Sequence, residues 1–298
     1  MAETLLIAFV VCILIGMPIS IAMGVGALVA AIFHPALNPI IIPTRFVGLL
    51  SDSYLLLSAP LFILAGNIAA RGGVARALID LATALVGRFR GGLAYVNILA
   101  SMFFGGISGS AVADVSALGT FLVPQMVRKG YNKDFSTALT VSTAVVAPII
   151  PPSIIAVIFA WMADESVAAM FVAGIVPGLL IGLGMAVPVF FIARKRNYPK
   201  EAPPTLGEFG AALRNALPAL MIPVIIMGGI LVAPTEAAAV AVVYALVVPP
   251  MFYRESVLRE LPRIFADSAR LSGVIGLIIG FAGAFGWVLT SSKFPFMV

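Results

Sequence analysis

The chain has 298 residues, of which 61% are hydrophobic and 10% charged, with a formal net charge of +5 and a mean hydropathy of +1.13. About a quarter of the residues of a soluble domain are charged. The composition of this chain therefore excludes a soluble domain and predicts an integral membrane protein. Its length allows roughly eight to ten membrane-embedded segments. With one cysteine and one histidine, Cys12 and His34, the chain cannot build a His/Cys metal centre.

The first 90 residues predict two membrane segments and an amphipathic helix. The apolar run 4–33 is interrupted at residues 16–18, which indicates a tilted or broken helix, or two short helices. A proline-rich loop is expected over 34–52 and a span over 53–70. Residues 73–89 alternate apolar and charged side chains in a pattern typical of a helix lying at the membrane interface.

A glycine- and serine-rich run interrupts the apolar stretch 91–127 around Ser108, Gly109 and Ser110. About 15 apolar residues lie on each side, which is too short for a full crossing on either arm. Lipid cannot satisfy free backbone groups, so this pattern predicts a re-entrant helical hairpin. Asp114 follows one turn later, where an ionisable side chain is costly and usually functional.

A proline-rich break divides the next predicted span, 134–160. Residues 147–153 contain three prolines, which remove backbone donors and indicate a discontinuous helix. Basic clusters at 128–133 and 194–200 are typical of loops on the cytoplasmic side. The remaining predicted segments, in chain order, are a span over 167–193, a polar linker over 201–214, spans over 215–232 and 234–253, an amphipathic segment over 254–270 and an apolar arm over 271–290.

The order of elements recurs after a shift of 174 residues, which places Pro60 on Pro234, Gly106 on Gly280 and Gly109 on Gly283. Few residues are identical, so the repeat is one of architecture. Repeated halves with interrupted helices at matching positions are typical of secondary transporters. Chance recurrence of glycine and proline in apolar sequence is the alternative.

The hairpin tip and the helix break supply the candidate chemistry. Hydroxyls near them, such as those of Thr143 and Ser153, and free carbonyls at a helix break suit a hard cation such as Na⁺, while a half-helix N-terminus suits a carboxylate. The alternative is that small residues only allow close helix packing. Asp114 is expected either to bind a cation or proton or to cap or pair within the hairpin.

An enzyme is the other class considered. Residues 106–109 match the G-x-S-G pattern of intramembrane serine proteases, but the serine would need a base, and His34 lies upstream in a loop. The chain also contains no P-loop. It is therefore expected to be a transporter without catalytic residues or cofactor.

Four stretches closely resemble the large membrane subunit of TRAP (tripartite ATP-independent periplasmic) transporters. They are GGISGSAVADVSALGTFLVPQM at 105–126, KGYNKDFSTALTVSTAVVAPIIPPS at 129–153, PTEAAAVAVVYAL at 234–246 and AGAFGWVLT at 282–290. The resemblance implies an all-α polytopic protein of the bacterial inner membrane, with re-entrant hairpins, broken helices, two structural repeats and an elevator mechanism. It implies sodium-coupled import of an organic acid such as a C4-dicarboxylate or sialic acid. A small membrane subunit and a periplasmic binding protein are the implied partners, and a binding-protein-independent elevator-type carboxylate carrier is the alternative.

Carried over by position, the resemblance assigns two sets of site residues. The set expected to bind Na⁺ is Ser108, Gly109, Ser110, Asp114, Thr143, Ala147, Pro148 and Ile150. The set expected to bind substrate is Ser108, Ser110, Ser153, Gly283 and Ala284. The predicted parts are a scaffold and arm over 1–90, a transport region over 91–160, a connecting span and linker over 161–214, a second scaffold and arm over 215–270 and a second hairpin over 271–298, expected to be incomplete.

Overall fold

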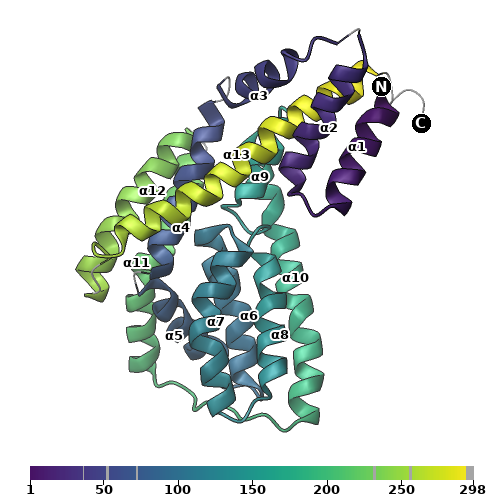
Figure 1. The fold of residues 1–298 in the computed structure, drawn as a ribbon. Coiled ribbons are helices and arrows are strands. Elements are labelled where there is room, and N and C mark those ends of the chain that lie inside the picture. Colours follow the sequence, from purple (N-terminus) through teal and green to yellow (C-terminus); the bar gives the residue numbers. More distant parts are fainter. Residues whose placement is uncertain (36, 52–53, 72, 231–232, 255–256, 293–298) are drawn as a thin grey trace. The chain divides into compact units, whose positions relative to one another are not determined.

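The computed structural model describes residues 1–35, 37–51, 54–71, 73–230, 233–254 and 257–292, and all regular structure within them is helical (Figure 1). The prediction of an all-α protein is confirmed. The chain folds as two compact units, one of residues 1–54 and 269–298 and one of residues 55–268. The α-helices are α1 (Ala2–Leu14), α2 (Ile19–Phe33), α3 (Ile41–Ser51), α4 (Ser58–Arg71), α5 (Val74–Val86), α6 (Gly92–Ser108), α7 (Ala111–Arg128), α8 (Lys133–Thr143), α9 (Ile154–Met162), α10 (Val167–Lys195), α11 (Leu206–Ile230), α12 (Pro234–Val248) and α13 (Leu261–Ser291).

In the first unit, the apolar run 4–33 forms two short helices, α1 and α2, that fold back on one another. Gly16 adopts φ 90° at the turn, and Pro18 precedes the first residue of α2. A left-handed glycine followed by a residue without a backbone donor ends one helix and lets the next begin. The sequence allowed a tilted helix, a broken helix or two short helices here, and the structure shows two short helices.

Two predictions for the first unit are wrong. Helix α3 occupies much of the expected loop 34–52, where the Asn38 side chain accepts a hydrogen bond from the Ile40 backbone (3.0 Å) near the start of α3. Helix α13 is continuous through residues 281–287, where an interruption was expected, and it also includes most of the amphipathic segment predicted over 254–270. Two of its glycines make close contacts instead: a Cβ at Gly280 would meet the Phe46 ring, and one at Gly283 would meet Leu49.

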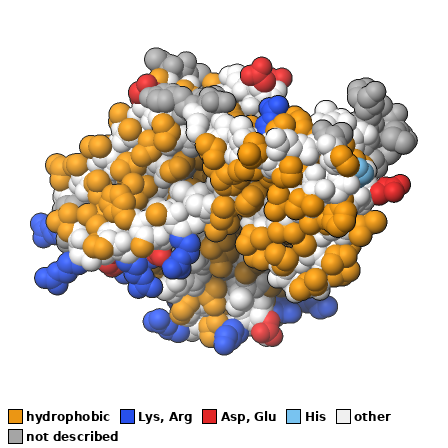
Figure 2. Space-filling view, turned by 45° about the horizontal axis from the view of Figure 1, so that its top comes forward, with side chains coloured by type: hydrophobic (Ala, Val, Ile, Leu, Met, Phe, Trp, Pro, Cys, Tyr) orange, Lys and Arg blue, Asp and Glu red, His pale blue; other side chains and the backbone are white. Residues whose placement is uncertain are grey.

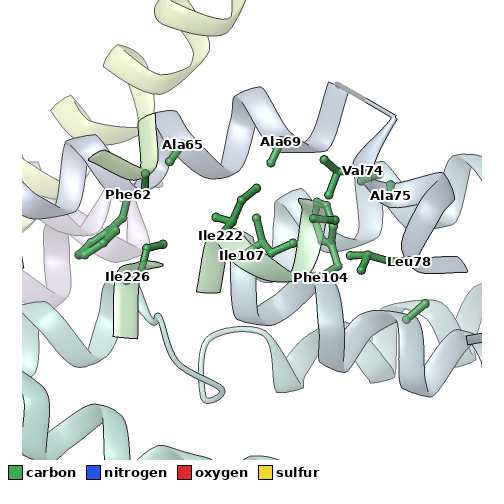
Figure 3. Packing of buried hydrophobic residues seen from close by; sticks show 14 of the residues in the cluster. Phe62, Ala65, Ala69, Val74, Ala75, Leu78, Phe104, Ile107, Ile222 and Ile226 are labelled. Carbon is green, nitrogen blue, oxygen red and sulfur yellow. The ribbon is translucent and has the colours of Figure 1, made fainter. Parts of the chain in front are cut away.

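The second unit contains the hairpin and the broken helix. Its main core brings together apolar side chains from α4 to α7 and from α9 to α12, and Figure 3 shows part of it. Phe104 of α6 lies beside Leu78 of α5, and Ile107 lies near Ile222 of α11 (Figure 3). Burial of these side chains fixes the hairpin against the arm helix α5.

Helices α4 and α5 meet at a bend of 69°. As predicted, α5 is amphipathic, but its apolar face packs against the protein core. Arg71, at the end of α4, donates to Glu260 (2.9 Å) and to Asp267 on α13 (3.1 Å). Glu260 and Asp267 are therefore tied to the end of α4 within this unit.

Among the residues that the structure describes, four helices are long and apolar enough to cross a membrane, and the bent α4–α5 pair would make a fifth. The four segments are Val167–Lys195, Leu206–Ile230, Pro234–Tyr253 and Leu261–Ser291. Helix α11 begins inside the predicted polar linker because Thr205 and Glu208 form a capping box, with Glu208 accepting from the Thr205 backbone (2.7 Å). Hydrophobic side chains cover much of the surface in Figure 2, as expected of a multi-pass membrane protein.

Candidate functional site

The predicted re-entrant hairpin consists of α6 and α7, with its tip at Ser108, Gly109 and Ser110. Gly109 has φ 57° and ends α6, and its backbone donates to the Gly105 carbonyl (3.0 Å). Ser110 then caps α7 by accepting from the Ala113 backbone (3.4 Å). The tip therefore places the C-terminus of one helix beside the N-terminus of the next.

The predicted break lies between α8 and α9. A single 3₁₀ turn, Ala144–Val146, follows α8, and the chain then runs irregularly through the prolines until Ser153 caps α9. Ser153 accepts from the Ala156 backbone (3.1 Å) and donates to the Pro148 carbonyl (2.5 Å). The discontinuous helix is confirmed, with one hydroxyl holding both sides of the break.

Glycines allow the tip to lie directly against the break. A Cβ added to Gly109 would lie 2.5 Å from the Pro152 carbonyl oxygen, and one added to Gly105 would lie 2.8 Å from the Ala147 Cα. On the other side of the hairpin, a Cβ on Gly66 would lie 2.8 Å from the Ser108 Cα. The hairpin tip and the helix break therefore lie directly against each other, and only glycine permits the approach.

Opposite helix ends meet at this place. The N-termini of α7 and α9 lie together, since a Cβ on Gly109 would be 3.2 Å from the Ile154 backbone nitrogen. These ends carry partial positive charge and free N–H groups, which suit a carboxylate. The C-terminus of α6 and the proline carbonyls supply oxygens that suit a cation. Groups that suit an anion and groups that suit a cation are thus available within one small, largely buried region.

A second polar group lies deeper between α6 and α8, side by side in Figure 1. Asn97 donates to the Thr140 hydroxyl (2.6 Å) and accepts from the Thr143 hydroxyl (3.0 Å), which in turn accepts from Ser101 (3.0 Å). All four side chains are buried. Sequence reasoning missed Asn97 and Ser101, although their spacing of four residues on an otherwise apolar helix was a usable signal.

Asp114 lies in the first turn of α7 and is fully buried. Its backbone donates to the Ser110 carbonyl (3.0 Å), but neither carboxylate oxygen has a hydrogen-bond partner among the described residues. The Ser101 hydroxyl lies near the carboxyl but does not meet hydrogen-bond geometry with it. Asp114 and Thr143 therefore belong with the deeper polar group, and no described hydrogen bond joins either side chain to the tip.

The other predicted site residues divide between the two units. Ala147 is buried beside Gly105, and the Ile150 side chain lies against Gly178 of α10. Gly283 and Ala284 lie within α13 in the first unit, where Ala284 is buried in a cluster with Leu5 and Val288. The structure therefore brings Ser108, Ser110 and Ser153 together within the second unit.

The fold and the site define a class of protein: a multi-pass helical membrane protein with a helical hairpin set against a broken helix. Residues 6–298 match the family of the tripartite ATP-independent periplasmic transporter, DctM component. The chain belongs to this family, so the resemblance of its four stretches is confirmed.

Curated relatives carry the same family name. The chain is 42% identical over 248 residues to the C4-dicarboxylate TRAP transporter large permease protein DctM of Pseudomonas aeruginosa, covering 82% of this chain and 58% of that protein. It is 38% identical to the 2,3-diketo-L-gulonate TRAP transporter large permease protein YiaN of Escherichia coli (83% and 59% covered). It is 35% identical to the sialic acid TRAP transporter large permease protein SiaM of Vibrio cholerae (83% and 58% covered).

In these three alignments the match covers just under three fifths of the relative's length. The relatives are named as transporter permeases, so the expectation of a transporter rather than an enzyme is confirmed. The serine of the G-x-S-G pattern, Ser108, therefore belongs to a transporter hairpin.

Proposed function

We propose that this chain is part of the large permease subunit of a sodium-coupled importer of carboxylate-bearing organic solutes in the bacterial inner membrane. The observation that carries the proposal is the contact of the hairpin tip with the helix break. It brings two helix N-termini and several backbone oxygens to one place. An anionic substrate and its coupling cation are expected to be bound at such a place.

The coupling cation is proposed to bind at the tip. Ser108 and Ser110 contribute hydroxyls, and the carbonyls around the break at Ala147, Pro148 and Ile150 contribute further oxygens. Na⁺ is a hard cation that prefers oxygen ligands. Its charge would offset the partial negative charge at the C-terminus of α6. Binding would then order the tip against the break before the substrate enters.

The substrate carboxylate is proposed to bind at the N-termini of α7 and α9, capped by Ser110 and Ser153. The relatives transport C4-dicarboxylates, 2,3-diketo-L-gulonate or sialic acid by name, and each of these substrate types carries a carboxylate. The tip would therefore recognise the carboxylate that these substrates share, and not one whole molecule.

We further propose an elevator movement with two partners. Helix α5 packs its apolar face on the hairpin, so it would link the moving part to a scaffold. A small membrane subunit would widen that scaffold, and a periplasmic binding protein would deliver the substrate. The exposed apolar face of α10, with Val176, Leu180 and Leu183, would contact lipid or the small subunit.

Uptake into proteoliposomes tests the proposal, with the whole permease, its small subunit and its binding protein. The substrates are radiolabelled succinate and sialic acid. In the reference measurement, choline chloride replaces NaCl. Ser108→Ala and Ser110→Ala are expected to raise the Na⁺ concentration for half-maximal uptake by about tenfold, a loss typical of weakened metal sites. Ser116→Ala, an exposed serine on α7, is the matched control. Uptake that does not depend on Na⁺ would refute the sodium coupling, and unchanged Na⁺ dependence in both variants would refute the tip site.

A further inference from the structure

A polar pocket of about 460 Å³ lies in the second unit, between α5, α11 and the segment Pro249–Tyr253 that continues α12. Helix α5 packs on α11, and α11 packs on α12, so the three elements form one wall-to-wall contact. The polar groups of the lining are Arg76, Asp80, Arg214, Asn215 and Tyr253. The hairpin tip and the helix break contribute no residue to this pocket, so the proposed transport chemistry does not account for it.

The charges of the pocket favour an anion. Arg76 and Arg214 supply two positive charges and Asp80 one negative charge, which leaves one net positive charge. Asp80 lies one turn after Arg76 on α5 and interacts with it electrostatically. A guanidinium binds a phosphate through two parallel hydrogen bonds. One net positive charge matches the single negative charge of a phosphodiester.

The pocket lies toward the cytoplasmic end of the membrane spans. Arg214 is about two turns into α11, which follows the basic cluster 194–200 that is typical of the cytoplasmic side. Tyr253 ends the candidate span Pro234–Tyr253, and its hydroxyl donates to the Asn215 carbonyl (2.9 Å). Tyrosine at the end of a span is typical of the depth of the lipid headgroups. The pocket is therefore expected at the level of the headgroups of the cytoplasmic leaflet.

Exposed apolar side chains continue from the pocket along α12. Phe252 lines the pocket and is exposed. Exposed apolar residues at intervals of three or four then follow one face of the span toward its start, and these are Met251, Val247, Val243 and Val240. A molecule with an anionic head in the pocket would lay an apolar chain on this face. An acyl chain fits that description, and a free inorganic anion has no such part.

We propose that this pocket binds the phosphodiester headgroup of an anionic phospholipid of the cytoplasmic leaflet. Arg76 and Arg214 would hold the phosphate, and an acyl chain would lie along the exposed face of α12. Basic pockets between membrane helices are suited to such headgroups. A bound lipid would join the arm helix α5 to α11 and α12. The proposal is independent of the sodium coupling and of the substrate site at the hairpin tip.

Native mass spectrometry of the delipidated permease with its small subunit tests the pocket. The probe is dioleoylphosphatidylglycerol, titrated in detergent. Arg214→Gln changes an exposed residue and is expected to weaken binding roughly fivefold, the effect of one basic side chain near an anionic lipid. Arg128→Gln, the same change at an exposed arginine in the last turn of α7, is the matched control and should bind as the wild type does.

Two further variants keep the test decisive. Arg76→Gln should weaken binding by a similar factor, and it replaces Arg214→Gln if that variant does not fold. Asp80→Asn should strengthen binding, because it removes the negative charge of the pocket. A general loss of structure would weaken binding in all three variants, so weaker binding by Asp80→Asn would contradict the role of charge. Wild-type affinity in both arginine variants, or an equal loss in Arg128→Gln, would refute the pocket as the site.

Two other probes separate an anionic lipid from other sources of phosphate. Dioleoylphosphatidylethanolamine has the same phosphodiester and acyl chains but no net charge, and it is expected to bind at least fivefold more weakly. Equal binding of the two lipids would refute the preference for an anionic headgroup. Inorganic phosphate at the concentration of the lipid should not displace phosphatidylglycerol. Displacement at equal concentration would identify a free anion as the occupant and refute the lipid site.

Discussion

Gly109 and Gly283 were paired by the predicted repeat, and the structure gives them different roles. Gly109 has φ 57°, ends α6 and faces the Pro152 carbonyl. Gly283 lies inside α13, where the absence of a side chain makes room for Leu49. A glycine in an apolar run therefore indicates either a helix end or a close helix contact, and only its surroundings decide which.

The first prediction concerns Gly109. Gly109→Ala adds a Cβ that would lie 2.5 Å from the Pro152 oxygen, so the tip should separate from the break and uptake should be lost. Gly130→Ala is the control, because Gly130 also has positive φ, at 86°, but has open space around it. It should cost only about 1–2 kcal/mol of stability from backbone strain and retain uptake. Equal uptake by the two variants would contradict the assignment of the contact.

At the scale of elements, the segment 196–201 binds the base of the hairpin. The Gly91 backbone donates to the Pro199 carbonyl (3.0 Å), and Lys129 pairs with Glu201 (3.0 Å). Tyr198 is buried and stacks on Tyr131 with ring centroids 4.2 Å apart. The start and the end of the hairpin are thereby held together, so movement is expected at the tip rather than at the base.

The second prediction concerns Tyr198. Tyr198→Ala removes a buried ring and should lower the free energy of unfolding by roughly 3–5 kcal/mol. Tyr198→Phe keeps the stack and loses the contacts of the hydroxyl with Asn132 and Arg196, which should cost about 1 kcal/mol. Denaturation in detergent gives both values. Hydrogen exchange should show faster opening of residues 128–135 in Tyr198→Ala, and protection equal to that of the wild type would contradict this role.

At the scale of the whole molecule, membrane crossing depends on long apolar helices with exposed apolar faces. Leu183 lies near the middle of α10 and is 65% exposed, while Leu206 begins α11 beside the polar linker and is 93% exposed. The two leucines are both exposed, but only Leu183 lies where lipid or another subunit would cover it. Exposure alone therefore does not identify a membrane-facing residue.

The third prediction uses these two leucines as a matched pair. Leu183→Lys should oppose insertion by about 2.5–3.5 kcal/mol and reduce the amount of permease in the membrane fraction. Leu206→Lys should change stability by no more than about 0.5 kcal/mol, as a surface substitution does. Quantitative immunoblotting of membrane fractions measures both. A similar loss for the two variants would contradict the placement of α10 in the membrane.

Much of the site could be predicted because its signals are local. Prolines remove donors wherever they stand, so the break between α8 and α9 followed from residues 147–153 alone. The hairpin followed from small polar residues flanked by short apolar arms. The capping box of Thr205 and Glu208 was also a local signal and was overlooked. Asn97 and Ser101 needed their partners on α8, which lie about 40 residues further along the chain.

By itself, the sequence determined the class of protein, the helical composition, the hairpin and the broken helix, because these follow from hydropathy and backbone chemistry. Only the tertiary structure decided which oxygens converge. It placed Thr143 and Asp114 with Ser101 instead of with the tip, and it kept α13 continuous through Gly283. The physical reason is that burial and hydrogen bonding between helices depend on which faces meet, and the order of residues along one helix does not specify its neighbour.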